Sequence, residues 1–254
     1  MDLLQAILLG IMQGITEFLP ISSDGHLALM QNYFGEINVG FDIILHFATL
    51  LAIIAFFWKD IIIILRDFFS LKYGSENFKI ALFIIIGSIP AAIFGFLLVG
   101  KIENIFSNLL ITAMGFFITG TFLMLASYIK KIGGKLNYSN SFIIGIAQAL
   151  AILPGLSRSG ATVSTGLLFG LDKEKAIKFS FLLSIPAILG ANILSIGRIS
   201  ALDIGLIVPG FLSAFIFGLF AIFIFIKYLK INNLKYFAFY CWMLAILCLI
   251  FYFT

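Results

Sequence analysis

Charged residues are scarce in this chain. They make up 11% of its 254 residues, whereas soluble domains carry about 25%. Hydrophobic residues make up 62%, and no polar run is long enough for a separate soluble domain or a disordered tail. This composition excludes a soluble fold and indicates an all-α polytopic membrane protein. We expect a single membrane domain covering residues 1–254.

Cysteine is also scarce, with only Cys241 and Cys248 present. Seven residues apart in a helix, their Cα atoms would lie about 10 Å from each other, too far for a disulfide. The first residues, MDLLQAILLGIMQ, lack both a basic residue before the apolar run and a small-residue cleavage site, so we expect no cleaved signal peptide. Loop lysines explain the net charge of +4, and no nucleic-acid partner is indicated.

Apolar stretches of two lengths are present. Six reach the roughly 17 to 25 residues that a spanning helix needs. These six are 41–58, 80–99, 107–129, 176–197, 203–228 and 234–253. Two pairs of shorter stretches, 2–18 with 24–34 and 141–153 with 160–170, are each interrupted by a Leu-Pro turn. We therefore expect six transmembrane helices and two re-entrant helical hairpins, at 2–35 and 141–170.

The two halves of the chain echo each other. GSIPAAIFG at 87–95 resembles LSIPAILGA at 183–191, and a proline lies inside an apolar helix in both, where it removes an internal hydrogen bond. This predicts an internal repeat, with repeat 1 at about 1–130 and repeat 2 at about 139–254.

Basic residues in the connecting segments predict the orientation of the two halves. One side would hold Lys59, Arg66, Lys72, Lys79, Lys130, Lys131, Lys135, Lys173, Lys175, Lys178, Lys227, Lys230 and Lys235. The other side keeps Lys101 and Arg198, so the first side is cytoplasmic by the positive-inside rule. The first hairpin then enters from outside and the second from inside. In such inverted repeats the broken helices meet near mid-membrane, so we expect the two Leu-Pro turns to meet.

Gln13 and Glu17 open the first of these turns, in QGITEFLPISSDGHL at 13–27. They lie four residues apart, on one face of a helix. An ionisable residue at membrane depth favours a functional role, although Glu17 could also simply reach the interface. It is a candidate metal ligand or orienting base. Gln13 is either a second metal ligand or a packing amide.

The residues after Pro20 begin a new helix. One of Ser22, Ser23 and Asp24 must cap it, and we favour a capping role for Asp24 over metal binding. A serine in such a turn can accept a phosphoryl group if a base is within reach. His26 follows Ser23 by about one helical turn and is the candidate base.

The second turn supplies Arg158, in QALAILPGLSRSGAT at 148–162. At membrane depth it needs an anion, which is either the carboxylate of Glu17 or another acid, or a phosphate held by two parallel hydrogen bonds. N–H groups at the start of the following helix would complete an anion cradle. We assign substrate binding to Ser22, Gly155, Ser157, Ser159 and Thr162. In the helix FDIILHFATLL, we expect an internal hydrogen bond for His46 rather than chemistry, and we place Asp42 at its outer end.

These segments resemble the undecaprenyl-diphosphate phosphatase family, also called bacitracin-resistance proteins. The family's motif of Glu or Gln, three residues, then Glu is matched by Gln13 and Glu17, and its P-x-S-S-x-G-H turn includes the counterparts of Ser22, Ser23 and His26. Its second motif, P-G-x-S-R-S-x-x-T, is matched by residues 154–162. With FDIILHFATLLA, SIPAAIFG and FSFLLSIPA in the expected order, the resemblance covers nearly the whole chain.

The resemblance implies an integral membrane hydrolase that removes the terminal phosphate of a polyprenyl diphosphate and so recycles the lipid carrier of cell-wall peptidoglycan synthesis. It implies a divalent cation, Mg²⁺ or Ca²⁺, and a multi-pass protein of the bacterial inner membrane whose site faces outward. The family more commonly has Glu at Gln13 and a neutral residue at Asp24. The resemblance makes Glu17 and Gln13 the metal ligands, but Gln13 supplies an amide in place of the second carboxylate, and Asp24 is a candidate substitute for that carboxylate.

Two other function classes compete with this interpretation. Inverted repeats with broken helices are also transporter architecture, so a polyprenyl-phosphate flippase or an anion transporter is the alternative. A purely structural membrane scaffold is disfavoured because it has no need of Glu17, His26 and Arg158 at membrane depth. The expected partners are the lipid substrate and the bilayer, and a homodimer is left open.

Overall fold

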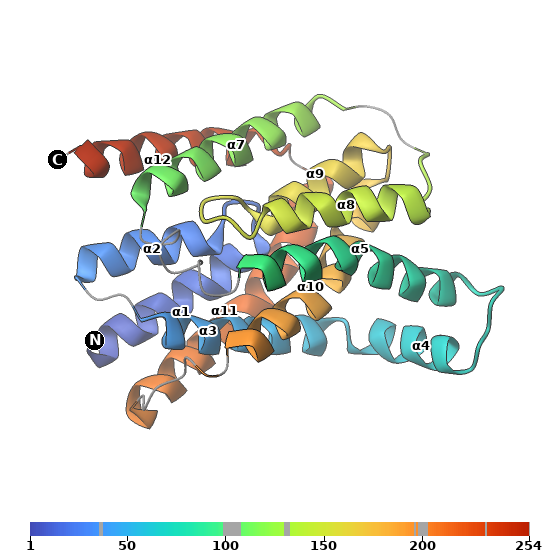
Figure 1. Cartoon of the computed structure of the whole chain (residues 1–254), viewed down its shortest axis with the longest axis horizontal. Coiled ribbons are helices and arrows are strands. Elements are labelled where there is room, and N and C mark those ends of the chain that lie inside the picture. The colour runs from blue at the N-terminus through green and yellow to red at the C-terminus, as the bar shows by residue number, and fades with distance from the viewer. Residues whose placement is uncertain are drawn as a thin grey trace.

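Helices make up all the regular structure in the part of the chain that the computed structural model describes, namely residues 1–35, 38–98, 108–129, 133–195, 197, 203–231 and 233–253. Figure 1 shows their arrangement. They are α1 (Leu3–Phe18), α2 (Ser23–Phe34), α3 (Val39–Phe56), α4 (Trp58–Phe69), α5 (Glu76–Leu98), α7 (Leu109–Ser127), α8 (Tyr138–Leu150), α9 (Arg158–Leu168), α10 (Lys173–Ser195), α11 (Ile204–Ile231) and α12 (Lys235–Phe253).

The six predicted spans are present as α3, α5, α7, α10, α11 and α12. Each is long and apolar enough to cross a membrane, and its bounds agree with the predicted range within a few residues. The prediction of an all-α polytopic membrane protein is therefore confirmed. Cys241 and Cys248 are buried and free, in agreement with the spacing argument.

Helix α4 was not predicted, because 59–79 was expected to be a loop. It follows α3 after the single residue Phe57. Ile64 is buried and Ile61 and Phe68 pack against the main core, while the ring of Phe68 stacks on that of Phe78 in α5. The run of four isoleucines hides the helical period in the sequence. Packing against α5 decides the conformation of this segment.

The two short helix pairs enter the bundle from opposite ends. Figure 1 shows α1 and α2 running inward from the end that holds both termini, whereas α8 and α9 come from the end that holds the α4–α5 turn. Their turns meet inside, where Ser159 Oγ donates to the carbonyl oxygen of Leu19 at 2.9 Å. The predicted meeting of the turns is confirmed. The arrangement is compatible with the predicted re-entrant hairpins and inverted repeat, whose boundaries stay predictions.

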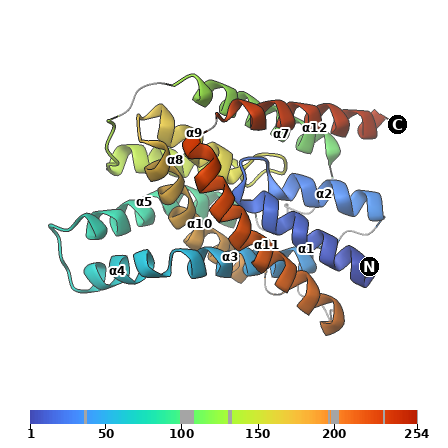
Figure 2. The ribbon, with the colours of Figure 1, turned by 180° about the vertical axis from the view of Figure 1, so that it is seen from behind.

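The long helices enclose these hairpins. Seen from behind, α11 crosses diagonally over α1 and α3 (Figure 2), and it contacts both helices. Helices α7 and α12 pair along one edge, and α5 packs on α8. The centre of the main core is aromatic, with Phe181 of α10 in ring contact with Phe18, Phe57 and Phe225. The shell therefore holds both turns in fixed positions.

Four basic residues used in the topology prediction, Lys101, Lys130, Lys131 and Arg198, lie outside the described residues, as does the side chain of Lys230. The charge-based orientation therefore stays a prediction.

Candidate functional site

The first turn depends on an unusual backbone conformation at Ser22. Its φ of 65° lies in the left-handed region, which is uncommon for residues other than glycine. Ser22 is buried and caps α2, because its Oγ accepts from the N–H of Gly25 at 3.3 Å. Capping by one of the three polar residues is thus confirmed, but the capping role favoured for Asp24 is wrong, because Asp24 lies inside the first turn of α2. Strain of this kind is concentrated at functional sites, and here it places Ser23 at the first position of α2.

Glu17 accepts hydrogen bonds from residues of both turns. Its Oε2 accepts from Ser23 Oγ at 2.5 Å and from Gln13 Nε2 at 3.1 Å. Its Oε1 accepts from the guanidinium of Arg158. Glu17 is only 7% exposed, so a buried carboxylate is held by an arginine and two neutral donors. The sequence-predicted residues from both turns thus meet at one carboxylate.

The second turn is held against α7. Gly155 has a φ of 80°, and a Cβ on Gly115 would lie 2.2 Å from the carbonyl oxygen of Pro154. Thr119 Oγ1 donates to the carbonyl oxygen of Gly155 at 3.0 Å and accepts from the N–H of Ser157 at 2.9 Å. These contacts fix the start of α9 and place Arg158 at its first position.

The hydroxyls of the predicted anion cradle have different roles in the structure. Ser157 caps α9 by accepting from the N–H of Gly160 at 3.0 Å, and it lines the cavity described below together with Ser22. Ser159 instead bonds Leu19, while Thr162 Oγ1 donates to the carbonyl oxygen of Arg158 at 2.8 Å. Ser159, Thr162 and Gly155 are not among the cavity-lining residues. They hold the turn in place, and a direct contact with substrate stays a prediction.

His26 does not contact Ser23 as the sequence predicted. Its Nδ1 donates to the carbonyl oxygen of Ser22 at 2.7 Å, and its Nε2 lies 2.8 Å from the hydroxyl of Tyr240. The ring stacks on Tyr240 and meets the edge of Phe116. Both ring nitrogens are therefore engaged away from Ser23. A spacing of three residues put the two side chains on one helix face, but Ser23 is the first residue of α2 and its hydroxyl turns toward Glu17.

His46 is a site residue that the sequence reasoning underrated. The predicted internal hydrogen bond is present, from Nδ1 to the carbonyl oxygen of Asp42 at 2.8 Å. However, Nε2 faces the site, at 3.3 Å from Asp24 Oδ1 and 3.8 Å from Glu17 Oε2. The signal that could have identified it is an ionisable residue within a spanning helix, which suggests function by default.

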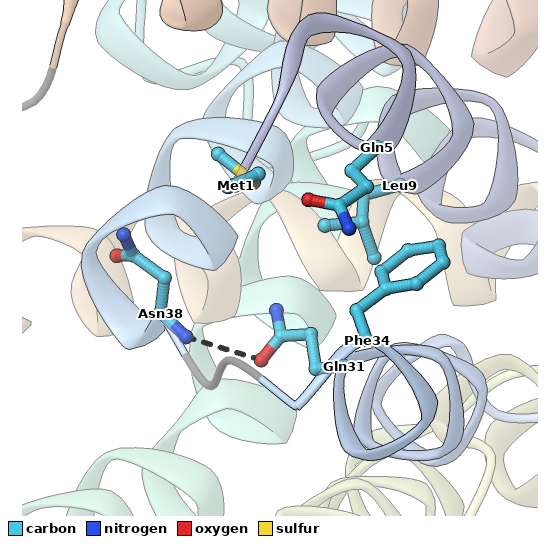
Figure 3. Close-up of a pocket in the computed structure, with 6 residues that line it drawn as sticks. All are labelled: Met1, Gln5, Leu9, Gln31, Phe34 and Asn38. Atoms are coloured by element: carbon cyan, nitrogen blue, oxygen red, sulfur yellow. Dashed lines mark hydrogen bonds between the residues drawn. The ribbon is translucent and has the colours of Figure 1, made fainter.

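Gln31 of α2 contacts the start of α3. Its Nε2 donates to Asp42 Oδ1 at 2.5 Å. Figure 3 shows its other contact, in which Oε1 accepts from the N–H of Asn38 at 3.3 Å. The hollow beside it, between Met1 and Phe34, is about 10 Å³, no more than one water needs. Gln31 therefore supports Asp42, and the hollow is not a ligand site.

A much larger cavity of about 970 Å³ lies at the meeting point of the two turns. Its polar part is formed by both turns, α2 and α3, and includes Glu17, Ser23, Asp24, His46, Gln148 and Arg158. Its apolar part is formed largely by α5 and α10, along small residues near Pro90 and Pro186 such as Ala91, Ala92 and Ala187. The cavity thus suits an amphipathic ligand with a polar head and an apolar tail.

The ionisable residues that line this cavity are unbalanced in charge. Glu17, Asp24 and Asp42 face one guanidinium, Arg158, and one imidazole, His46. By residue type, the acidic groups outnumber the basic groups by one. The described residues contain no group of three His, Cys, Asp or Glu side chains placed to hold a metal by themselves. Glu17 and Asp24 are carboxylates of the kind that Mg²⁺ or Ca²⁺ takes as ligands together with oxygens of a bound substrate.

Comparisons with known proteins agree with this architecture. The chain is 46% identical over 244 residues to an undecaprenyl-diphosphatase of Thermosipho africanus, covering 95% of this chain and 97% of that protein. It is 42% identical over 261 residues to an undecaprenyl-diphosphatase of Christiangramia forsetii, covering 99% and 98%. The family model described as bacitracin resistance protein BacA matches residues 6–247. The chain therefore belongs to the BacA family of bacitracin resistance proteins.

Proposed function

We propose that this protein is a membrane phosphatase that hydrolyses undecaprenyl diphosphate, or a related polyprenyl diphosphate, to the monophosphate and phosphate. The observation that carries the proposal is the hydrogen-bonded chain from Ser23 through Glu17 to Arg158, at the polar part of an amphipathic cavity. The names of the similar proteins support the choice of substrate.

The two parts of the cavity match the two parts of such a lipid. The diphosphate would lie against Arg158, Ser157 and the N-terminus of α9, where N–H groups and the helix dipole favour an anion. Glu17 uses only one guanidinium nitrogen of Arg158, and the other donors can grip phosphate oxygens. The prenyl chain would follow the small residues of α5 and α10 toward the lipid.

A divalent cation, Mg²⁺ or Ca²⁺, would bind together with the diphosphate. The carboxylates that line the cavity support this proposal, because a diphosphate beside ionised Glu17 and Asp24 is repelled unless cations compensate. Glu17 and Asp24 are the ligands we propose, since both approach His46 Nε2. The Nε2 of Gln13 donates to Glu17, and its buried Oε1 has no partner in the protein. An amide oxygen is a ligand that hard cations accept, so we keep Gln13 as a third ligand. When bound, the cation neutralises charge that develops on the phosphate oxygens.

The reaction would begin at Ser23. Glu17 accepts the hydroxyl proton, Ser23 Oγ forms a bond to the terminal phosphorus, and the bond from that phosphorus to the bridging oxygen breaks. Polyprenyl monophosphate leaves, and water then hydrolyses the phosphoserine to release phosphate. Arg158 and the N–H groups of α9 stabilise charge in the transition state. His26 holds the Ser22 turn that positions Ser23 and is not assigned the proton transfer.

The cellular setting follows from the same proposal. Six spanning helices make this a multi-pass membrane protein. We propose the bacterial inner membrane as its location, with the site facing outward. There the enzyme would recycle the lipid carrier of peptidoglycan synthesis, and copies of the chain could act as a homodimer.

The test is phosphate release by purified protein from a C55 diphosphate, with and without chelator. Wild-type protein should release phosphate, and chelator should abolish the release. Arg158→Ala should lower kcat/KM by about 10²- to 10³-fold, and Ser23→Ala should lower kcat. Near-normal turnover of both variants would refute the site. A Ser23→Ala variant with full turnover beside an inactive Arg158→Ala would assign the attack to water.

A carrier of polyprenyl phosphate is the second candidate. It is favoured by one observation, that two hairpins enter from opposite ends and meet at the same cavity. Liposomes distinguish the two functions. A carrier moves lipid monophosphate between leaflets without releasing phosphate, whereas the proposed enzyme releases phosphate from diphosphate in detergent, where no leaflets exist.

A further inference from the structure

Gln148 is a buried amide with no partner in the protein. It lies in the last turn of α8 and is 2% exposed. Neither its Nε2 nor its Oε1 has a hydrogen-bond partner, and among the buried side chains of the described residues it is the one amide with both atoms unsatisfied. It lines the large cavity together with Ser157 and Arg158 of the same hairpin. Burial of unpaired donors and acceptors is unfavourable, so a ligand that bonds this amide would be stabilising.

Comparison with the first hairpin shows why the amide is left unpaired. Gln13 is the glutamine that precedes the first turn, and four residues later Glu17 accepts from its Nε2 at 3.1 Å. Gln148 precedes the second turn, but the residue four positions later is Ile152, an apolar residue that also lines the cavity. The hairpins therefore place similar amides beside their turns, and only the second leaves its amide without an acceptor.

We infer that Gln148 binds the phosphate chain of the lipid in this cavity. Its Nε2 donates to a phosphate oxygen, and its Oε1 accepts from a water molecule that accompanies the phosphate. A prenyl chain cannot satisfy either atom, so the contact belongs to the head group. Gln148 adds a neutral donor to the charged contact of Arg158. This inference rests on the proposed function, because it takes a polyprenyl phosphate as the ligand.

The experiment uses Gln148→Met, which keeps the side-chain length and removes both polar atoms. Ser164→Ala is the matched control, because Ser164 Oγ is also buried without a partner but does not line the cavity. For each purified variant we would measure the melting temperature without ligand, its rise with undecaprenyl monophosphate or with inorganic phosphate, and KM and kcat for the diphosphate.

Both variants should melt at or above the wild-type temperature, since each removes an unsatisfied buried group. Gln148→Met alone should lose most of the stabilisation by monophosphate and should raise KM by about tenfold. Gln148→Glu places a negative charge beside the phosphate and should raise KM further. This variant replaces Gln148→Met in the test if the Met variant does not fold. If Gln148→Met loses the stabilisation by inorganic phosphate as well as that by the lipid, then Gln148 contacts the phosphate group and needs no prenyl chain on its ligand.

Two outcomes overturn the inference. One is an unchanged KM and unchanged monophosphate stabilisation in both Gln148 variants. The other is a melting temperature of Gln148→Met far below that of Ser164→Ala with ligand response intact, which would make the amide structural. The proposed function fails separately, if wild-type protein is stabilised by monophosphate in a Gln148-dependent way yet releases no phosphate from the diphosphate.

Discussion

Ser23 donates its hydroxyl hydrogen to Glu17 Oε2 at 2.5 Å, across the Pro20 turn that separates α1 from α2. Glu17 in turn accepts from Arg158, which the second hairpin brings from a position 141 residues further along the chain. The nucleophile we propose, its base and its anion-binding group therefore form one hydrogen-bonded chain. Four predictions test this site and the contacts that support it, and a fifth tests an ion pair and hydrogen bonds outside it.

Glu17→Gln should abolish most activity while the protein still folds. The amide keeps the size of the carboxylate but cannot accept the Ser23 proton, and general-base catalysis contributes about 10²- to 10⁴-fold. The measurement is kcat for phosphate release. Thr16→Val is the control, because Thr16 is buried beside Glu17 and bonds only the carbonyl oxygen of Met12. A Glu17→Gln variant within a few-fold of wild type would rule out Glu17 as the base.

His46→Asn should reduce activity by about 10- to 100-fold, as is typical of residues that orient metal-binding carboxylates. The shorter side chain withdraws the group that lies between Asp24 and Glu17. The concentration of Mg²⁺ or Ca²⁺ needed for half-maximal activity should rise as well. If that concentration and kcat both stay at the wild-type values, His46 only fills the helix bundle.

Tyr240→Phe should lower stability by about 1 kcal/mol and leave kcat nearly unchanged. The change removes the hydrogen bond to His26 Nε2 while the stacked rings remain. Thermal unfolding in detergent measures the loss, with exposed Tyr236→Phe as the control. A large fall in kcat at unchanged stability would instead show that His26 takes part in the proton transfer.

Gly115→Ala should destabilise the protein by about 1 to 3 kcal/mol, the usual range for overpacking, and should reduce activity. The new Cβ would lie 2.2 Å from the carbonyl oxygen of Pro154, so the turn that presents Arg158 must shift. Gly74→Ala is the matched control, since nothing lies within 4 Å of its Cβ position. Equal effects of the two substitutions would contradict tight packing of α7 on the turn.

Asp67 lies in α4, outside the six spanning helices, and we expect its carboxyl group to make the stability of the protein depend on pH. Hydrogen bonds from Asn77 and Lys72 lower the pKa of its carboxyl from 3.8 to about 2. Because the folded-state pKa is the lower one, ionised Asp67 stabilises the fold above pH 3.8, and the stabilisation is lost as the pH falls toward 2. Asp67→Asn should therefore lower the melting temperature at pH 7.

The same variant also supplies the pH test. Its melting temperature should approach that of wild type as the pH falls from about 4 to 2. Lys72→Met, which removes one of the donors to Asp67, should show part of the effect at pH 7. A difference between Asp67→Asn and wild type that stays constant over this pH range would contradict the shifted pKa.

Sequence reasoning succeeded where one chain property was sufficient. Helix length and apolar composition predicted the six spans, and the Leu-Pro interruptions predicted two pairs of short helices whose turns meet at Ser159 and Leu19. Sequence reasoning failed where contacts with residues far away in the chain decide the conformation of a segment or a side chain. Packing against α5 makes α4 helical, and Tyr240 of α12 holds the ring of His26 away from Ser23.

The amino-acid sequence by itself determined the number of spanning helices and the polar residues available at the two turns, because hydrophobic length and helix-breaking residues act locally. Only the tertiary structure decided which of those residues touch. The left-handed backbone of Ser22 aims Ser23 at Glu17, and α3 brings His46 beside the same carboxylate. Side-chain directions of this kind depend on elements far apart in the chain, and the spacing of residues within one helix does not contain them.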